Sequence, residues 1–340
     1  MKKRKNFKKC IGWILCAVML MTLMVPQNIS AAQNNNNLYR YCEVKTGKFG
    51  CVNRKGKVIV KPTYDFIDTF VNGLALAEKN GKYGYINTKG KEVIKVQYKQ
   101  ANPFSEGLAL VLEGKKYKYI DKTGSTVINV KGKDPSSFSE GYASMQINGK
   151  WGFMDKTGKI VIEPKYDMAY SFMDGLALVN EDGKDGFIDT DGNYVIKLTD
   201  KVDYASFSDG YALIRKGNKW GFIDKKGNIV IKPAFYGAAD FKEGFASIME
   251  KVGDKYLSGY INKKGKMITK VIYEEVDDFQ EGMACVKKNG KYGFINKKGK
   301  LVVNTIYNNA FSYENGLAYV VKGSNAYFID KTGKKVITIK

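Results

Sequence analysis

The feature that most constrains the fold is an internal repeat, which fills the chain from about residue 38 to its last residue. The segment 219–231, with the sequence KWGFIDKKGNIVI, recurs at a spacing of 34 residues in most copies. Its leading aromatic position falls at residues 49, 83, 117, 151, 185, 220, 258, 292 and 326. A period of this length is typical of arrays in which each unit packs on its neighbours. We therefore expect nine copies of one unit in place of two ordinary domains.

Short β-branched and aromatic runs predict that each unit is a three-stranded antiparallel sheet. The first two strands are of the types 74–77 and 83–86, and the Asn-Gly pair at 80–81 favours a two-residue turn with positive φ at both positions. This turn places Ala77 opposite Gly84, so one face of the hairpin carries small side chains. A neighbouring unit can approach such a face closely.

Glycines mark the turns of every unit. The second and third strands are joined by turns such as 155–158, where Asp opens the turn and Gly ends it, as in a type I turn followed by a bulge. Of the 36 glycines, 33 occupy one of four repeat positions, and Gly12, Gly132 and Gly237 do not. A four-residue extension within 250–257 lengthens one hairpin, which we predict to be a distinct contact loop.

The expected fold is therefore all-β, a tandem array of nine three-stranded antiparallel units of about 34 residues. We favour an open, twisted, solenoid-like array. The alternative is a β-propeller, whose blades usually have about four strands and 40–45 residues. The chain also begins with a first strand and ends with a third strand, so no split blade is available to close a ring.

The Trp-Gly-Phe-Ile-Asp-x-x-Gly segment, followed by Phe-x-Glu-Gly-x-Ala, resembles the WG (KWG) β-repeat family over residues 38–340. The resemblance implies an all-β, often exported bacterial protein that acts as a binding or scaffold module and has no assigned reaction. Several units depart from the pattern, so the units are not expected to bind one common ligand. The departures are Lys118 and Tyr327 at the glycine, and Asp185, Ser258 and Ala326 at the aromatic residue. We expect the framework aromatics to pack in the core and not to stack on sugars: Tyr83, Trp151, Trp220 and Tyr292.

The N-terminus has the three parts of a secretory signal peptide. Six basic residues and no acid lie within 2–9, an apolar run spans 11–25, and small residues at 30–32 provide a cleavage site. An uncleaved membrane anchor is the alternative, although an apolar run of about 15 residues is short for a span. We therefore expect a secreted or cell-surface protein without a transmembrane span in its mature chain. Its expected parts are a signal peptide at 1–32, an Asn-rich linker at 33–37 and the repeat array at 38–340.

The net charge of +22 is concentrated at repeated turns, apart from six positive charges in the expected signal peptide. The candidate ligand-binding residues lie in these turns: Arg54, Lys55, Lys225, Lys226, Lys263, Lys264, Lys297 and Lys298. As the unit repeats, the turns should form a basic ridge that attracts an anionic cell-wall or surface polymer, or a protein partner. The alternative is solubilising charge that discourages strand pairing at exposed edges. Nucleic acid would respond to the same charge, but export argues against it as the natural partner.

The chain contains no histidine, which excludes catalysis by Ser-His-Asp or Cys-His and a His-ligated zinc site. Carboxylates precede the repeat glycine in six units, and their repetition indicates a structural role such as bonding a turn amide: Glu106, Glu140, Asp174, Asp209, Glu243 and Glu281. We predict no enzymatic activity, no cofactor and no metal site. A carboxylate-dependent hydrolase and a structural spacer without a specific ligand are the alternatives.

Cys42 and Cys51 are candidates for a disulfide in the first unit. If 46–47 is a two-residue turn, the two cysteines lie opposite each other as a non-hydrogen-bonded pair, with Cα atoms about 4.5 Å apart. That separation is near the lower end of the disulfide range. Two unbonded thiols are the alternative. Cys285 is expected to be a small buried hydrophobe.

Overall fold

The computed structural model describes residues 38–43, 45–198 and 206–339. Every regular element in these residues is a β-strand, so the all-β prediction is confirmed for them. Within these ranges, no helix is long and apolar enough to cross a membrane. The predicted signal peptide and Asn-rich linker, residues 1–37, lie outside the described residues. The chain divides into two compact units, with the boundary between Ser171 and Phe172.

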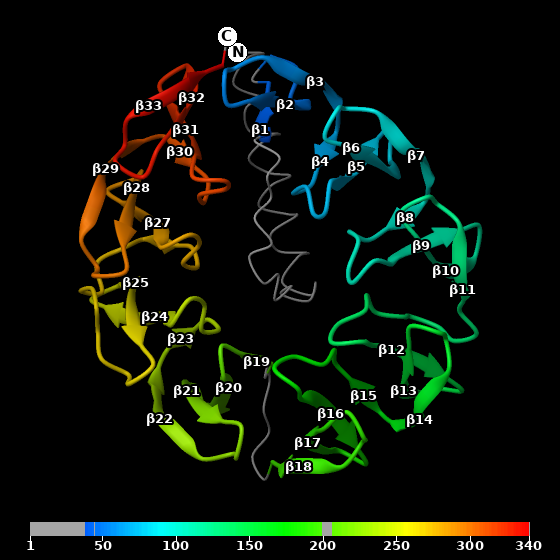
Figure 1. Ribbon diagram of the computed structural model, residues 1–340. Coiled ribbons are helices and arrows are strands. Elements are labelled where there is room, and N and C mark those ends of the chain that lie inside the picture. The colour runs from blue at the N-terminus through cyan, green and yellow to red at the C-terminus, as the bar shows by residue number, and fades with distance from the viewer. Residues whose placement is uncertain (1–37, 44, 199–205, 340) are drawn as a thin grey trace. The chain divides into compact units, whose positions relative to one another are not determined.

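Figure 1 labels the strands of both units. The first unit contains β1 (Leu38–Cys42), β2 (Phe49–Asn53), β3 (Val58–Tyr64), β4 (Phe66–Ile67), β5 (Leu74–Lys79), β6 (Lys82–Asn87), β7 (Glu92–Tyr98), β8 (Gln100–Ala101), β9 (Ala109–Glu113), β10 (Lys116–Ile120), β11 (Thr126–Asn129), β12 (Tyr142–Ile147), β13 (Lys150–Asp155), β14 (Ile160–Tyr166) and β15 (Met168–Ala169). The second unit contains β16 (Ala177–Glu181), β17 (Lys184–Ile188), β18 (Tyr194–Lys197), β19 (Phe207–Ser208), β20 (Tyr211–Lys216), β21 (Lys219–Asp224), β22 (Ile229–Phe235), β23 (Gly237–Ala238), β24 (Phe245–Val252), β25 (Lys255–Asn262), β26 (Glu275–Val276), β27 (Met283–Lys288), β28 (Lys291–Asn296), β29 (Leu301–Tyr307), β30 (Asn309–Ala310), β31 (Ala318–Lys322), β32 (Asn325–Ile329) and β33 (Lys335–Thr338).

These strands form nine antiparallel sheets, in agreement with the nine predicted repeats. Three sheets have three strands (β1-β2-β3, β12-β13-β14 and β23-β24-β25), and six have four (β4-β5-β6-β7, β8-β9-β10-β11, β15-β16-β17-β18, β19-β20-β21-β22, β26-β27-β28-β29 and β30-β31-β32-β33). The prediction of three strands per unit is therefore wrong for most units. The segment expected to be a connector supplies a short extra strand, such as β4 beside β5. It does so because its backbone groups need hydrogen-bond partners: Asp68 N donates to Leu76 O over 2.9 Å.

The hairpin between β5 and β6 has the predicted register. Ala77 lies opposite Gly84, and residues 80 and 81 have φ values of 53° and 71°. The same pair of positive φ values occurs at 148–149, 182–183 and 289–290. The prediction of a two-residue turn with positive φ at both positions is therefore confirmed at these hairpins.

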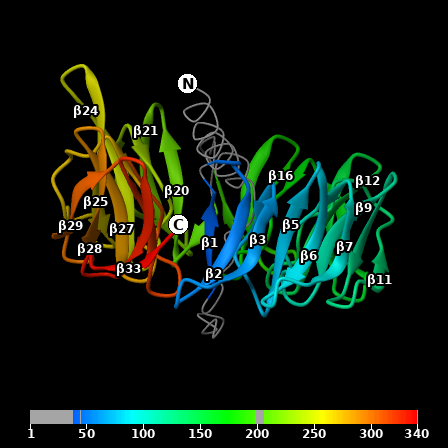
Figure 2. The same cartoon turned by 90° about the horizontal axis from the view of Figure 1, so that it is seen from above.

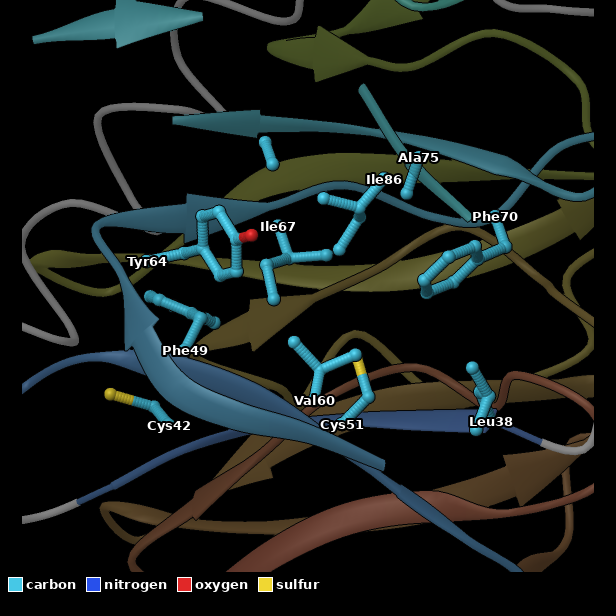
Figure 3. Packing of buried hydrophobic residues seen from close by; sticks show 11 residues of the cluster. Leu38, Cys42, Phe49, Cys51, Val60, Tyr64, Ile67, Phe70, Ala75 and Ile86 are labelled. Carbon is cyan, nitrogen blue, oxygen red and sulfur yellow. The ribbon is translucent and has the colours of Figure 1, made fainter. Parts of the chain in front are cut away.

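The two faces of a sheet differ in side-chain size, and this difference allows neighbouring sheets to stack. Ala77 on the small face is fully buried, in a cluster with Val60 of the preceding sheet (Figure 3). On the opposite face, Tyr85 lies in a cluster with Ala109 of the following sheet. Stacking of bulky on small faces therefore builds the apolar core that one sheet of three or four strands cannot provide alone.

The repeated aromatic-glycine pair has a glycine because the outermost strand of the sheet leaves no room for a Cβ atom there. A Cβ atom on Gly84 would lie 2.6 Å from backbone atoms of Lys95 and Val96. The cause is an irregularity of β7, in which three residues lie opposite this single glycine. Lys118 and Tyr327 replace the glycine in sheets whose outermost strands, β11 and β33, pair regularly at this point. These departures from the repeat pattern therefore follow the geometry of the outermost strand.

Candidate functional site

The turns that carry the predicted basic residues have the same hydrogen bonds in all nine sheets. In one of them, Gly158 N donates to Asp155 O over 3.0 Å and Gly158 has a φ of 84°. Asp155 Oδ1 also accepts the amides of Thr157 and Lys159, over 2.9 and 3.1 Å. The residues that accept two turn amides in this way are Asn53, Asn87, Asp121, Asp155, Asp189, Asp224, Asn262, Asn296 and Asp330. The predicted turn type is thus confirmed.

These hydrogen bonds also affect the charge of the turns. The Thr157 hydroxyl and the turn amides lower the pKa of Asp155 below its usual value. Hydrogen bonds from Asn228 and the turn amides lower the pKa of Asp224 in the same way. Both carboxylates are therefore ionised at neutral pH, and each partly offsets the positive charge of the lysines beside it.

The carboxylates that precede the repeat glycine connect one sheet to the next. Glu243 Oε1 accepts the amide of Glu281 over 2.8 Å, and its Oε2 accepts the amide of Gly282 over 2.9 Å. The predicted bond to a turn amide is thereby confirmed here and in four further pairs: Glu106–Gly141, Asp174–Gly210, Asp209–Gly244 and Glu281–Gly316. We call each of these contacts a carboxylate bridge. Glu243 has a φ of 51°, a region in which Asn is favoured over Glu, so the bridge explains why a longer acid occupies the position.

A lysine from the turn of the following sheet joins each bridge. Lys297 Nζ lies 3.1 Å from Glu243 Oε2, and Lys263 Nζ lies 2.6 Å from Asp209 Oδ1. Lys225 donates to the backbone oxygen of Asp174. The other two pairs are Lys156–Glu106 at 2.8 Å and Lys331–Glu281 at 3.3 Å. These pairs were not predicted from the sequence, although the acid and the lysine recur at a separation of 50 to 54 residues.

The predicted basic ridge therefore consists of two kinds of residue. Lys225, Lys263 and Lys297 contact a neighbouring sheet and hold the repeats together. The remaining side chains are exposed, and within the described ranges no ion pair involves them: Arg54, Lys55, Lys226, Lys264 and Lys298. Lys226, Lys264 and Lys298 lie in three successive sheets of the second unit, and we call them the outer turn lysines.

The first hairpin differs from its prediction. Glu43 N donates to Lys48 O over 2.8 Å, whereas the expected two-residue turn would pair residue 45 with Lys48. Cys42 consequently lies opposite Phe49, and Cys51 lies opposite Arg40. Figure 3 shows the two sulfur atoms pointing in different directions, and Cys51 is a buried thiol. The predicted Cys42–Cys51 disulfide is therefore wrong, because the register differs by two residues from the predicted one.

Other predicted core positions agree with the structure. Tyr83, Trp220 and Tyr292 are half-buried and pack against three different apolar clusters, which confirms core packing for these aromatics. Cys285 is a buried thiol, as predicted, and burial raises its pKa. In the part of the chain that the structure describes, no group of three or more Cys, Asp or Glu side chains is arranged to hold a metal ion.

Solved structures show a similar fold at low sequence identity. "Crystal structure of the eukaryotic initiation factor" matches with a TM-score of 0.60 and 11% identity, covering 88% of this chain and 94% of that chain. "KlHsv2 with loop 6CD replaced by a Gly-Ser linker" matches with a TM-score of 0.44 and 7% identity, covering 65% and 88%. The WD40 domain of SCAP from fission yeast matches with a TM-score of 0.39 and 9% identity, covering 88% and 93%. The first of these likenesses concerns the fold alone. A search of curated proteins found no significant match.

The family model described as "WG containing repeat" matches the chain in eight successive segments. The matched segments are 49–83, 83–117, 119–151, 151–184, 186–220, 220–256, 259–292 and 292–325. They include the bridging carboxylates and most of the aromatic-glycine pairs and turns described above. The chain therefore belongs to the WG-repeat family.

Proposed function

We propose that this chain is a secreted, non-enzymatic repeat scaffold that binds an anionic cell-envelope polymer through its outer turn lysines. The observation that carries the proposal is the division of the basic turn residues into two kinds. Lys225, Lys263 and Lys297 have partners in the neighbouring sheet, whereas the adjacent Lys226 and Lys264 extend from the same turns without such partners. A structural role thus accounts for the first lysine of each turn and leaves the second without one.

Repetition makes this arrangement suited to a polymer. Each outer turn lysine is exposed, so one contact with an anion in water contributes little free energy. Several such lysines at equivalent positions of successive sheets can contact successive anionic groups of one chain, and their contributions add. The five bridging carboxylates accept amides of the following sheet, which supports binding over carboxylate catalysis as the role of these repeats.

We also infer that the sheets are blades of a β-propeller, the alternative to the open array. Most sheets have the four strands usual for a blade, and the short first strand is the fourth strand that the predicted three-stranded unit did not include. Small-angle scattering of the secreted chain tests this inference. A closed, compact chain of this length has a radius of gyration of about 20 Å. An open stack of nine sheets spaced about 10 Å apart would give about 27 Å, which would contradict it.

Co-sedimentation with purified cell wall across a salt series tests the binding function. We expect the wild-type protein to sediment at low salt and to be released as salt rises, because exposed charges are screened. Replacing Lys226, Lys264 and Lys298 by Ser should abolish sedimentation without changing the unfolding midpoint. The matched control replaces three exposed lysines of the opposite hairpin turns, Lys82, Lys184 and Lys288. Equal loss in both triple variants, or no wild-type binding at low salt, would contradict the proposal and leave a protein partner as the candidate.

A further inference from the structure

Several departures from the repeat lie close together in the second unit. The four-residue extension makes β24 and β25 eight residues long, and Figure 2 shows the tip of this hairpin beyond those of its neighbours. Gly237, one of the glycines outside the repeat positions, pairs with Met249 of β24. A Cβ atom on Gly237 would lie 2.9 Å from Met249 Cε, so a larger residue would displace this contact. Tyr236, immediately before it, replaces the acidic or amide residue found in other repeats at Asp65, Asp167, Glu274 and Asn308.

These departures produce an exposed pair of aromatic rings. The rings of Tyr236 and Tyr256 lie with centroids 5.8 Å apart and an interplanar angle of 71°. Tyr236 is 41% exposed and Tyr256 is 52% exposed. Among the described residues, no other aromatic side chain is as exposed as these two. Apolar surface of this kind, placed by a unique insertion, is typical of a contact site.

A lysine is held against the aromatic pair. In two other repeats, the lysine at the start of the second long strand pairs with an acid 17 residues later: Lys48 with Asp65 at 2.5 Å and Lys150 with Asp167 at 2.6 Å. The equivalent lysine here is Lys219, whose Nζ lies 3.3 Å from the ring centroid of Tyr236 and 3.8 Å from Glu250 Oε2. A ring thus occupies the position of the acid found 17 residues later in those two repeats, and the cation contacts both this ring and Glu250.

We propose that Tyr236, Tyr256 and Lys219 form a binding site for an acidic polysaccharide. A sugar ring has apolar C–H faces and a polar rim, which match an exposed aromatic ring beside a charged donor. Lys251 is exposed and pairs with Tyr256 in the hairpin register, so it adds positive charge on the face of Tyr256. A carboxylate-bearing sugar chain is therefore electrostatically preferred over a neutral one. This site lies at the hairpin end of the sheets, opposite the turns of the outer turn lysines, so the inference does not rest on the proposed function.

Binding of polygalacturonate tests the site, with two comparison polymers. Dextran provides sugar rings without charge, and polyglutamate provides carboxylates without rings. We expect polygalacturonate to bind at least about tenfold more tightly than either. Tyr256→Ala should weaken this binding by about tenfold, equivalent to about 1.4 kcal/mol, and Lys219→Ala should weaken it and reduce its salt dependence.

Matched variants separate the site from general surface effects. Val302→Ala removes an exposed apolar side chain of β29, and Lys291→Ala removes the lysine at the equivalent position of β28; both should bind polygalacturonate as the wild type does. Equal affinity for polyglutamate and polygalacturonate would overturn the proposal, as would equal binding by Tyr256→Ala and Val302→Ala. Cell-wall binding through the outer turn lysines should persist in Tyr256→Ala, so failure of one site is distinguishable from failure of the other.

Discussion

Removing one carboxylate bridge should destabilise the repeat array by a predictable amount. Glu243→Ala removes two hydrogen bonds to amides of the next sheet, at 2.8 and 2.9 Å, and the ion pair with Lys297 at 3.1 Å. Each amide bond contributes about 1 kcal/mol net. The lysine pair contributes at most about 0.5 kcal/mol, since both side chains are partly exposed. Alanine keeps the same positive φ, so backbone strain cancels, and we expect a loss of about 2 kcal/mol.

Urea unfolding followed by tryptophan fluorescence measures this loss by linear extrapolation. Glu243→Gln retains one carbonyl acceptor for an amide and should lose about half as much. The matched control is Glu163→Ala, which removes an exposed glutamate of β14 that forms no bridge. It should change the free energy of unfolding by less than about 0.5 kcal/mol. If Glu243→Ala changed the free energy of unfolding by no more than Glu163→Ala does, the bridge would have no structural role.

Three further predictions concern packing and pH. Ala77→Leu should cost about 2 to 3 kcal/mol in urea unfolding, because its side chain faces the preceding sheet with no exposed surface, whereas Ala234→Leu at an exposed position should cost little. Gly84→Ala should lower the free energy of unfolding by about 2 kcal/mol or more, because a Cβ atom would lie 2.6 Å from the backbone of β7. Hydrogen exchange of the backbone amides along β7 should also become faster. Asp155 and Asp224 have pKa values lowered by hydrogen bonds in the folded state, so the folded protein binds fewer protons than the unfolded chain. The stabilisation from these two carboxylates is present above about pH 4 and is lost as the pH falls through the lowered pKa values. Asp155→Asn keeps a hydrogen-bond acceptor but does not titrate. The unfolding midpoint of this variant, measured from pH 5 to 2, should therefore depend less on pH than that of the wild type.

The repeated unit was predictable from the sequence where local chemistry determines the geometry. The Asn-Gly pair at 80–81 set the turn, the turn set the register, and the register placed Ala77 on the face that meets the preceding sheet. The short strands such as β4 were not predictable from residue type, because two residues carry no clear alternation pattern. They form because the connector backbone, held beside β5, bonds to its exposed edge.

Interactions between repeats were the part that the sequence did not reveal. The role of Glu243 in bonding a turn amide was predicted, but its partner amide in the following sheet and its contact with Lys297 were not. Such pairs depend on how closely neighbouring sheets stack, which local propensity does not specify. The prediction for the first hairpin was wrong for a related reason. The residues at 46–47 fit a two-residue turn, yet Glu43 pairs with Lys48, and Cys42 lies opposite Phe49 instead of Cys51.

The salt dependence of binding to soluble poly(glycerol phosphate) tests the central claim most directly. Each lysine that contacts a phosphate of a flexible chain contributes about 0.7 to the slope of log affinity against log salt concentration. Replacing Lys226, Lys264 and Lys298 by Ser should therefore reduce the slope by about 2, while the control triple variant at Lys82, Lys184 and Lys288 retains the wild-type slope. Identical slopes for the wild type and the outer turn variant would contradict the claim that these lysines bind the polymer.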